Sequence, residues 1–205
     1  MHLKAKDLAL ISVFSAVCFV AGYGRGLALS SLPGVFEFMT VLIFVSGLMF
    51  GWVVGALNGA LTLFIYMLVP YPFAHPAAFL FTISPVLLLV MVLLGAVYGV
   101  VGGVLGKRYN LMKINARFVA EMAFWGFVLT FIYDVLGSVG FYLAYPIFYA
   151  SVWEAIYLTF IPLYMPYPPI IHTFTNTIIF AILVPPLVKA ISKFPGIKTS
   201  KSQSN

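Results

Sequence analysis

Long apolar stretches, separated by short polar or proline-rich segments, make up nearly all of the sequence. Several of them approach the roughly 20 residues that an α-helix needs to cross a bilayer. They predict one span over 7–23, two short spans within 36–69, and single spans over 79–105, 118–145 and 171–191. The pattern therefore predicts an all-α membrane protein with six transmembrane helices.

Two segments depart from the simple pattern of one apolar stretch per span. The stretch 36–69 is too long for one crossing, and FGWVVG (Phe50–Gly55) near its middle supplies glycines for a tight turn. The segment 146–169 is rich in proline and aromatic residues, which favours a re-entrant or interfacial helix.

The composition supports the same class of protein. Hydrophobic residues make up 63% of the chain and charged residues 8%, where a soluble domain carries about a quarter charged residues. A chain with so few charged residues has too little polar surface to fold as a water-soluble domain. We expect one integral membrane domain over 1–194 and a disordered cytoplasmic tail over 195–205.

Lysine and arginine are distributed unevenly between the two sides of the predicted bundle. Ten of the eleven fall on one side: Lys4, Lys6, Lys107, Arg108, Lys113, Arg117, Lys189, Lys193, Lys198 and Lys201. Arg25 falls on the other side. Because cytoplasmic loops retain basic residues, both termini are predicted to be cytoplasmic. The basic residues are spread over several loops and form no stripe, which argues against nucleic-acid binding.

Asp134 lies near the middle of the apolar stretch 127–146. An ionisable side chain at such a depth costs about 2.5–3.5 kcal/mol or more, and it commonly marks a functional site. Two interpretations remain open: Asp134 lines a ligand cavity that opens outward, or it is protonated or paired and only fixes helix packing. Ser138 and Tyr142 share its helix face at four-residue spacing.

Further candidates for ligand binding lie in the same half of the predicted bundle. His172 and Asn176 are one turn apart on one face of the last span, with Thr173 beside them, although helix ends also carry polar residues for capping. Thr62 and Tyr66 are one turn apart in the third span.

Four more candidates come from the loops on the outer side and from the start of the second span. Glu37 begins the second span, where a negative charge also suits the helix dipole. Trp153 and Glu154 lie in the aromatic segment, whose rings either form a belt at the membrane interface or stack on a flat heterocycle. Arg25, the basic residue on the outer side, completes the predicted substrate-binding set.

Motifs for catalysis or metal binding fail on inspection. GGVLGK at 102–107 lacks the first glycine of a phosphate loop, and Arg108 stands where a Ser or Thr would hold magnesium. No cluster of Cys and His has the spacing of a metal site, so we expect neither metal nor cofactor. Ser138 and His172 leave an intramembrane serine protease open as a minor alternative. The chain is predicted not to be an enzyme.

The first span carries small residues at four-residue spacing, Ala5 with Ala9 and Ser12 with Ala16. Small residues at this spacing let helices approach closely in lipid. The face they form is therefore either packed against the other spans or is a contact surface for a partner protein.

Three features together resemble one known family. They are the Ala-x-x-x-Ala pattern of the basic N-terminus, the segment FEFMTVLIFVSGLMFGWVVGALNGALTLFIY with its glycines around the inner turn, and the last span beginning HTFTNTIIFAIL. The chain is similar to the substrate-binding S components (EcfS) of energy-coupling factor vitamin transporters. These are six-helix prokaryotic cell-membrane proteins.

The resemblance implies a mechanism. An S component captures a vitamin or related heterocycle from outside, beneath a lid that 24–34 would form here. It then docks on a transmembrane coupling protein (EcfT) with two ABC ATPases, through the face of Ala5 and Ala9, and tilts to release the ligand inside. The alternative is a standalone secondary transporter in which Asp134 relays protons.

Overall fold

The computed structural model describes residues 3–28, 37–68, 84–109, 114–160 and 169–193. Its α-helices are α1 (Ala5–Ala28), α2 (Met39–Phe50), α3 (Trp52–Leu68), α5 (Pro85–Arg108), α6 (Ala116–Ala144), α7 (Val152–Phe160) and α8 (Pro169–Ile191), and a short 3-10 helix, η1, covers Pro146–Phe148. Within these ranges there is no strand. The predicted all-α class is therefore confirmed.

Helix length separates these elements into two groups. Four helices are long and apolar enough to cross a membrane: α1, α5, α6 and α8. The apolar helices α2 and α3 have 12 and 17 residues. At about 1.5 Å per residue, α2 covers about 18 Å of a hydrocarbon core that is about 30 Å thick. The six-span count and the cytoplasmic position of the termini stay predictions.

The turn between α2 and α3 is built on Gly51. This residue has φ +98°, a backbone conformation that glycine adopts without steric cost, and its N–H donates to Gly47 O at 2.8 Å. The glycine-containing segment 50–55 was predicted to divide the apolar stretch here, and the structure confirms it.

The first helix extends further than the sequence pattern predicted. It continues to Ala28, so residues 24–28, predicted as the start of the loop, are helical. Leu27 and Ala28 are strong helix formers, and Gly22 packs close to Met39 and Tyr66, which supports this part of the helix. The rest of the predicted lid and the predicted tail over 195–205 lie outside the described residues.

Glycines bring the backbones of α3 and α5 into direct contact. The two helices are antiparallel, and a Cβ built on Gly99 would collide with the backbone of Gly55. One turn along, Gly59 meets Gly95 in the same way, and at the other end Gly103 meets the backbone of Gly51 and Trp52. Small residues allow such close approach where helices pack in lipid. We call these three pairs the glycine ladder.

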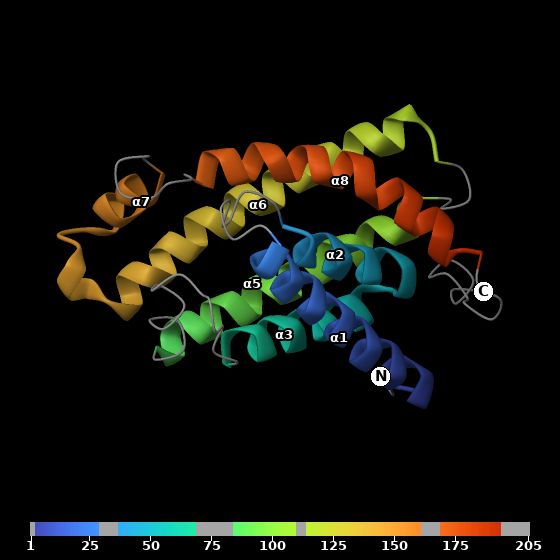
Figure 1. The fold of residues 1–205 in the computed structure, drawn as a ribbon, viewed down its shortest axis with the longest axis horizontal. Coiled ribbons are helices and arrows are strands. Elements are labelled where there is room, and N and C mark those ends of the chain that lie inside the picture. The colour runs from blue at the N-terminus through green and yellow to red at the C-terminus, as the bar shows by residue number, and fades with distance from the viewer. Residues whose placement is uncertain (1–2, 29–36, 69–83, 110–113, 161–168, 194–205) are drawn as a thin grey trace.

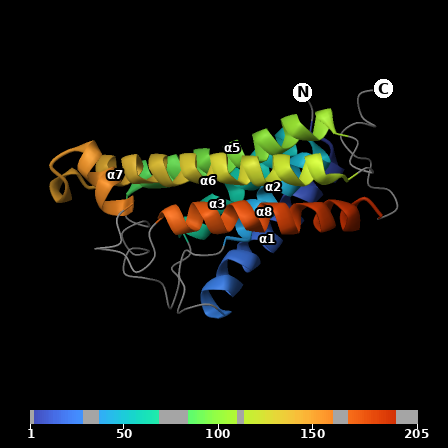
Figure 2. The ribbon, with the colours of Figure 1, turned by 90° about the horizontal axis from the view of Figure 1, so that it is seen from above.

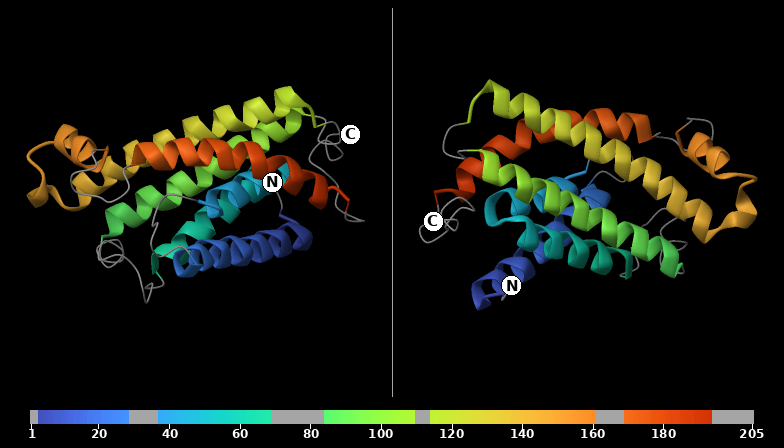
Figure 3. Two further views of the ribbon diagram at one scale, coloured as in Figure 1. Left: turned by 45° about the horizontal axis from the view of Figure 1, so that its top comes forward. Right: turned by 180° about the vertical axis from the view of Figure 1, so that it is seen from behind.

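The helices form a layered, elongated bundle. Helix α6 contacts both α8 and α5, and α5 also contacts α3. Seen from behind, α6, α5 and α3 follow one another, and α8 crosses α6 (Figure 3, right). Helix α2 touches α1, α3, α5 and α8, and eleven of its twelve residues are buried. Helix α1 crosses the others at a steep angle (Figure 2).

The two ends of the bundle differ in chemistry. The start of α1, the end of α5, the start of α6 and the end of α8 lie at one end, whereas α7 lies at the other (Figure 1). The first of these, the basic end, carries the described lysines and arginines other than Arg25: Lys4, Lys6, Lys107, Arg108, Arg117, Lys189 and Lys193. The second, the aromatic end, carries η1 and α7. The predicted grouping of the basic residues is thus present in the fold.

Candidate functional site

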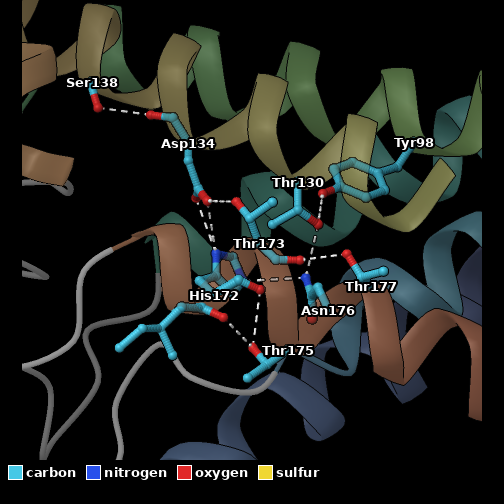
Figure 4. Close-up of polar contacts among 10 residues, drawn as sticks. Tyr98, Thr130, Asp134, Ser138, His172, Thr173, Thr175, Asn176 and Thr177 are labelled. Atoms are coloured by element: carbon cyan, nitrogen blue, oxygen red, sulfur yellow. Dashed lines mark hydrogen bonds and ion pairs between the residues drawn. The ribbon is translucent and has the colours of Figure 1, made fainter. Parts of the chain in front are cut away.

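Polar side chains connect α6 and α8 in a regular antiparallel register. Gly126 lies against Phe180, where an added Cβ would be 2.7 Å from Phe180 Cβ. One turn along, Thr130 meets Asn176, and one further turn brings Asp134 to His172 (Figure 4). Each step of four residues along α6 thus matches a step of four back along α8. We call the Thr130–Asn176 and Asp134–His172 pairs the polar ladder.

The carboxylate of Asp134 is held by two side chains of α8. His172 Nδ1 lies 3.0 Å from Asp134 Oδ1, and Thr173 Oγ1 donates to Oδ2 at 3.1 Å. The Asp134 side chain is 8% exposed and that of His172 is 14% exposed. Asp134 lies ten residues before Ala144, which places it about 15 Å from that end of α6. A carboxylate this far inside is stabilised by its partners, as buried charges require.

His172 contacts polar groups through both ring nitrogens. Its Nε2 lies 3.3 Å from Asn176 Nδ2, an N–H donor, so Nε2 is the acceptor in this contact. Nδ1 then carries the ring proton and donates it to Asp134. The imidazole thus lies between a carboxyl group and an amide.

The network continues from α8 through α6 into α5. Asn176 Nδ2 also donates to Thr130 Oγ1 at 3.1 Å, and Tyr98 OH donates to the same oxygen at 3.2 Å (Figure 4). The Tyr98 side chain is fully enclosed at 1% exposure and lies against the rings of Phe180 and Tyr133. Three helices are thus joined by one chain of hydrogen bonds.

A second polar cluster, centred on Asn58, joins α1, α2 and α3. Asn58 Nδ2 donates to Ser46 Oγ at 2.7 Å, and Asn58 Oδ1 accepts from Ser15 at 2.8 Å and from Thr62 at 3.2 Å. Asn58 Nδ2 also points to Cys18 Sγ at 3.8 Å. The amide is fully satisfied, so this cluster is a closed packing unit. Thr62, a predicted binding residue, belongs to it and not to the polar ladder.

Other predicted binding residues lie around the polar ladder without joining it. Glu37 is 9% exposed, and its Oε1 accepts from the N–H of Met39 at 3.1 Å, near the start of α2. It is close enough to Tyr98 to interact with it electrostatically, as is Asp134. Tyr142 is half-buried two turns beyond Asp134. Tyr66 is half-buried in α3, with its ring 5.5 Å from that of Tyr23.

The aromatic segment provides a helix cap and exposed rings. Glu154 accepts a hydrogen bond from the N–H of Ala150, and Ser151 Oγ accepts from the N–H of Glu154 at 3.1 Å, so these side chains cap α7. Trp153 is 75% exposed and points away from the bundle interior. Both were predicted to contact substrate, and the structure places them at the aromatic end, apart from Asp134. Arg25 lies in α1, and its side chain is outside the described part of the chain.

Two residues of the site escaped the sequence analysis, Tyr98 and Thr130. Thr130 is one turn before Asp134, and extending its helix face in both directions would have found it. Tyr98 is the one polar side chain between Ser84 and Lys107 in the sequence.

The small residues of the first span face outward. Ala5, Ala9, Ser12 and Ala16 are all exposed, while α1 turns Ile11, Ser15 and Cys18 toward the rest of the bundle. Packing within the chain, one of the two interpretations of this face, does not occur in the described structure. Among the same described residues, no group of His, Cys, Asp and Glu has the arrangement of a metal site.

Comparison with known families supplies the identity. The family of the ECF transporter, substrate-specific component, matches residues 6–194. The chain belongs to this family. It is therefore a substrate-specific membrane component of an ECF transporter, a binding subunit for a small molecule that works with an ECF module, as the resemblance predicted. No curated protein and no solved structure matches it.

Family membership helps to decide which of the two polar clusters of this S component is the candidate binding site. A substrate-specific component needs polar groups that meet a small molecule inside an apolar bundle, and few such groups are needed to orient it. The Asn58 cluster has its amide satisfied by other side chains. The polar ladder includes an ionisable pair and connects to Tyr98, so it is the candidate binding site.

Proposed function

We propose that this S component captures a vitamin or a related heterocycle from outside the cell and delivers it through an ATP-driven importer in a prokaryotic cell membrane. The observation that carries the proposal is the polar ladder, a carboxylate deep in α6 held by His172 and Thr173. Ionisable groups at this depth are costly and are typically retained for function. Its position toward the aromatic end, opposite the basic end, agrees with capture from outside if the basic end is cytoplasmic.

The energy for release comes from other chains in this proposal. The sequence 102–107 has no phosphate-binding loop, and its three glycines instead pack against α2 and the α2–α3 turn. The exposed face of Ala5, Ala9, Ser12 and Ala16 supports docking on a transmembrane coupling protein (EcfT) that carries two ABC ATPases. After docking, the S component tilts and opens its site to the cytoplasm.

One observation favours a second candidate function. Asp134 and His172 form a titratable pair inside the bundle, and such pairs serve as proton relays in transporters. A standalone proton-coupled transporter would use this pair to move protons with its substrate. It would need no ATPase partner.

The contacts of His172 give no support to the serine protease alternative. Ser138 Oγ donates to the backbone oxygen of Asp134 at 2.8 Å. Both ring nitrogens of His172 are directed at Asp134 and Asn176, so the imidazole does not serve as a base for Ser138. A nucleophile needs a base within hydrogen-bond reach.

Reconstitution separates these functions. The tagged full chain is purified with its membrane partners, and uptake of radiolabelled riboflavin, biotin and thiamin is measured in proteoliposomes. We expect uptake of one compound that requires ATP, stops when the ATPases are removed, and persists when a protonophore collapses the proton gradient. Uptake by the chain alone that follows the proton gradient would establish the secondary transporter instead.

A further inference from the structure

Two buried side-chain oxygens lack a hydrogen-bond partner within the described structure, Thr40 Oγ1 on α2 and Asn176 Oδ1 on α8. Thr40 is 2% exposed and Asn176 is fully buried. A buried polar atom without a partner costs free energy, so native structures keep few of them and each requires an explanation. The remaining atoms of the Asn176 amide are engaged, since Nδ2 contacts Thr130 and His172.

The two oxygens belong to facing sides of neighbouring helices at the same level. Helices α2 and α8 are in contact and run in the same direction (Figure 1). The rings of Phe44 and Phe180 meet across this contact, with their centroids 5.2 Å apart. Thr40 is one turn before Phe44, and Asn176 is one turn before Phe180. Parallel helices keep such steps in register, so Thr40 and Asn176 lie one turn above the ring pair, on its aromatic-end side.

The surroundings of this pair are aromatic and acidic. The buried rings of Phe44 and Phe180 pack edge-to-face, and the Tyr98 ring lies 6.3 Å from that of Phe180. Asp134 and Glu37 both lie close enough to Tyr98 to interact with it electrostatically. Among the described side chains, lysine and arginine are located at the basic end (Figure 1). Among the side chains that the structure describes, His172 is the one basic group near Thr40 and Asn176 that a carboxylate or phosphate group of a ligand would meet.

The hydrogen bonds of Asn176 determine whether its unpartnered amide atom is an acceptor or a donor. Because Nδ2 donates to Thr130 Oγ1 and to His172 Nε2, Oδ1 is directed away from both and remains an acceptor (Figure 4). The reverse orientation of the amide would require a proton on His172 Nε2. The Thr40 hydroxyl is both a donor and an acceptor. Together the pair therefore matches a ligand edge that carries an N–H beside a C=O.

We propose that Thr40 and Asn176 bind a flat heterocycle through a cyclic amide, imide or urea edge, with its ring over Phe44 and Phe180. The ligand N–H donates to Asn176 Oδ1, and the ligand C=O accepts from Thr40 Oγ1. This assignment rests on the proposed function, because it names the substrate class of that site. It adds Thr40 and α2 to a site otherwise built from α5, α6 and α8.

A panel of named probes tests the substrate class. Riboflavin, biotin and uracil carry the proposed edge, whereas thiamin, nicotinic acid and pyridoxine lack it. Binding of each to the purified full chain is measured by calorimetry, and the tightest binder is measured again in its form methylated at the ring nitrogen. We expect saturable binding of at least one compound of the first group and none of the second. Methylation should weaken binding about 100-fold or more, because it removes the donor and leaves Oδ1 unpaired.

Variants test the two residues. Thr40→Val and Asn176→Leu should each weaken binding of that probe about 10- to 100-fold. Thr40→Val should leave the melting temperature of the unliganded protein unchanged or raise it, because an unpartnered hydroxyl is replaced by a methyl group of similar shape. The matched control is Thr177→Val, whose hydroxyl donates to the backbone oxygen of Thr173 in the same helix. Its affinity should equal that of the wild type.

The outcomes separate this inference from the function on which it rests. Saturable binding of thiamin, nicotinic acid or pyridoxine would support vitamin capture and overturn the proposed edge. Equal affinity for the methylated probe, or an unchanged affinity for the probe in Thr40→Val, would also overturn the proposed edge. Binding of no compound in the panel would overturn the substrate class, and absence of any small molecule in native mass spectrometry of the purified chain would argue against capture itself.

Discussion

The α3–α5 interface and the α6–α8 interface share one geometry and differ in chemistry. Both are antiparallel contacts in which a step of four residues on one helix meets a step of four on the other. In the glycine ladder, Gly55 meets Gly99 and the backbones touch. In the polar ladder, Asp134 meets His172 and the side chains hold each other by hydrogen bonds.

This difference indicates that the α3–α5 contact is fixed, whereas a ligand is able to replace hydrogen bonds of the α6–α8 contact. A backbone contact without side chains has no alternative rotamer, and any added atom separates the helices. Hydrogen bonds between side chains are replaceable, because a ligand offers equivalent donors and acceptors. We therefore expect substitutions in the glycine ladder to act on folding and those in the polar ladder to act on ligand binding.

The largest loss of stability is expected for Gly99→Ala. Its new methyl group would collide with the carbonyl of Gly55, which is backbone and has little freedom to move. We expect the free energy of unfolding to fall by about 3 kcal/mol, at the upper end of overpacking effects. Thermal unfolding of the detergent-solubilised protein measures the change.

The control for this substitution is Gly137→Ala, also at a buried glycine in a helix. There the added Cβ would lie 3.4 Å from the flexible end of Met91. Alanine favours helix over glycine by up to about 1 kcal/mol, so this variant should be neutral or slightly more stable. Equal destabilisation of the two variants would show that the glycine ladder has no special role.

The next largest effect is expected for Asp134→Asn. The neutral amide has one acceptor oxygen where the carboxylate offers separate oxygens to His172 and Thr173. We therefore expect the free energy of unfolding to fall by about 1–3 kcal/mol. Ligand affinity should fall as well, since the network that orients Asn176 is disturbed. Calorimetry and thermal unfolding measure the two effects.

Glu121→Gln is the matched control on the same helix. Glu121 is paired at 3.8 Å with Arg108, whose side chain is 63% exposed, and such surface pairs contribute about 0–1 kcal/mol. Stability and affinity should both stay near the wild-type values. A loss of affinity in Glu121→Gln as large as that in Asp134→Asn would remove the distinction between a binding carboxylate and a surface carboxylate.

A smaller effect, confined to stability, is expected for Thr62→Val. Thr62 donates one hydrogen bond to Asn58 in a cluster that is otherwise satisfied. Removal of this hydrogen bond should lower the free energy of unfolding by about 1 kcal/mol and leave ligand affinity unchanged. Thr130→Val, the same change in the polar ladder, should lower affinity. If Thr62→Val lowered affinity equally, the Asn58 cluster would also have to belong to the site.

The sequence predicted those parts of the fold that depend on a single segment of the chain. The apolar stretches located α5, α6 and α8, and the glycines of FGWVVG located the turn at Gly51. The close contact of Gly55 with Gly99 was not predictable in the same way. Glycines at four-residue spacing reveal a face that permits close packing, but the partner helix depends on how the whole chain folds.

The candidate site was predicted in part for a similar reason. Asp134, His172 and Asn176 stand out because each is a polar residue in an apolar span, and the structure brings them together. Thr62 stood out equally, yet it faces Asn58 instead. Spacing along one helix shows which residues share a face, whereas the direction of that face is decided by contacts between helices.

The smallest effect on stability is expected for Ala9→Trp. Ala9 is exposed on α1, outside both ladders, so the change should alter the free energy of unfolding by less than about 0.5 kcal/mol and leave ligand affinity unchanged. Uptake with the coupling module should nevertheless be lost, because the indole would prevent close approach of a partner helix. Val17→Trp is the control, an exposed position on the same helix away from the small-residue face. It should retain uptake, and loss of uptake in both variants, or of ligand affinity in Ala9→Trp, would show that the partner does not dock on the face of Ala5 and Ala9.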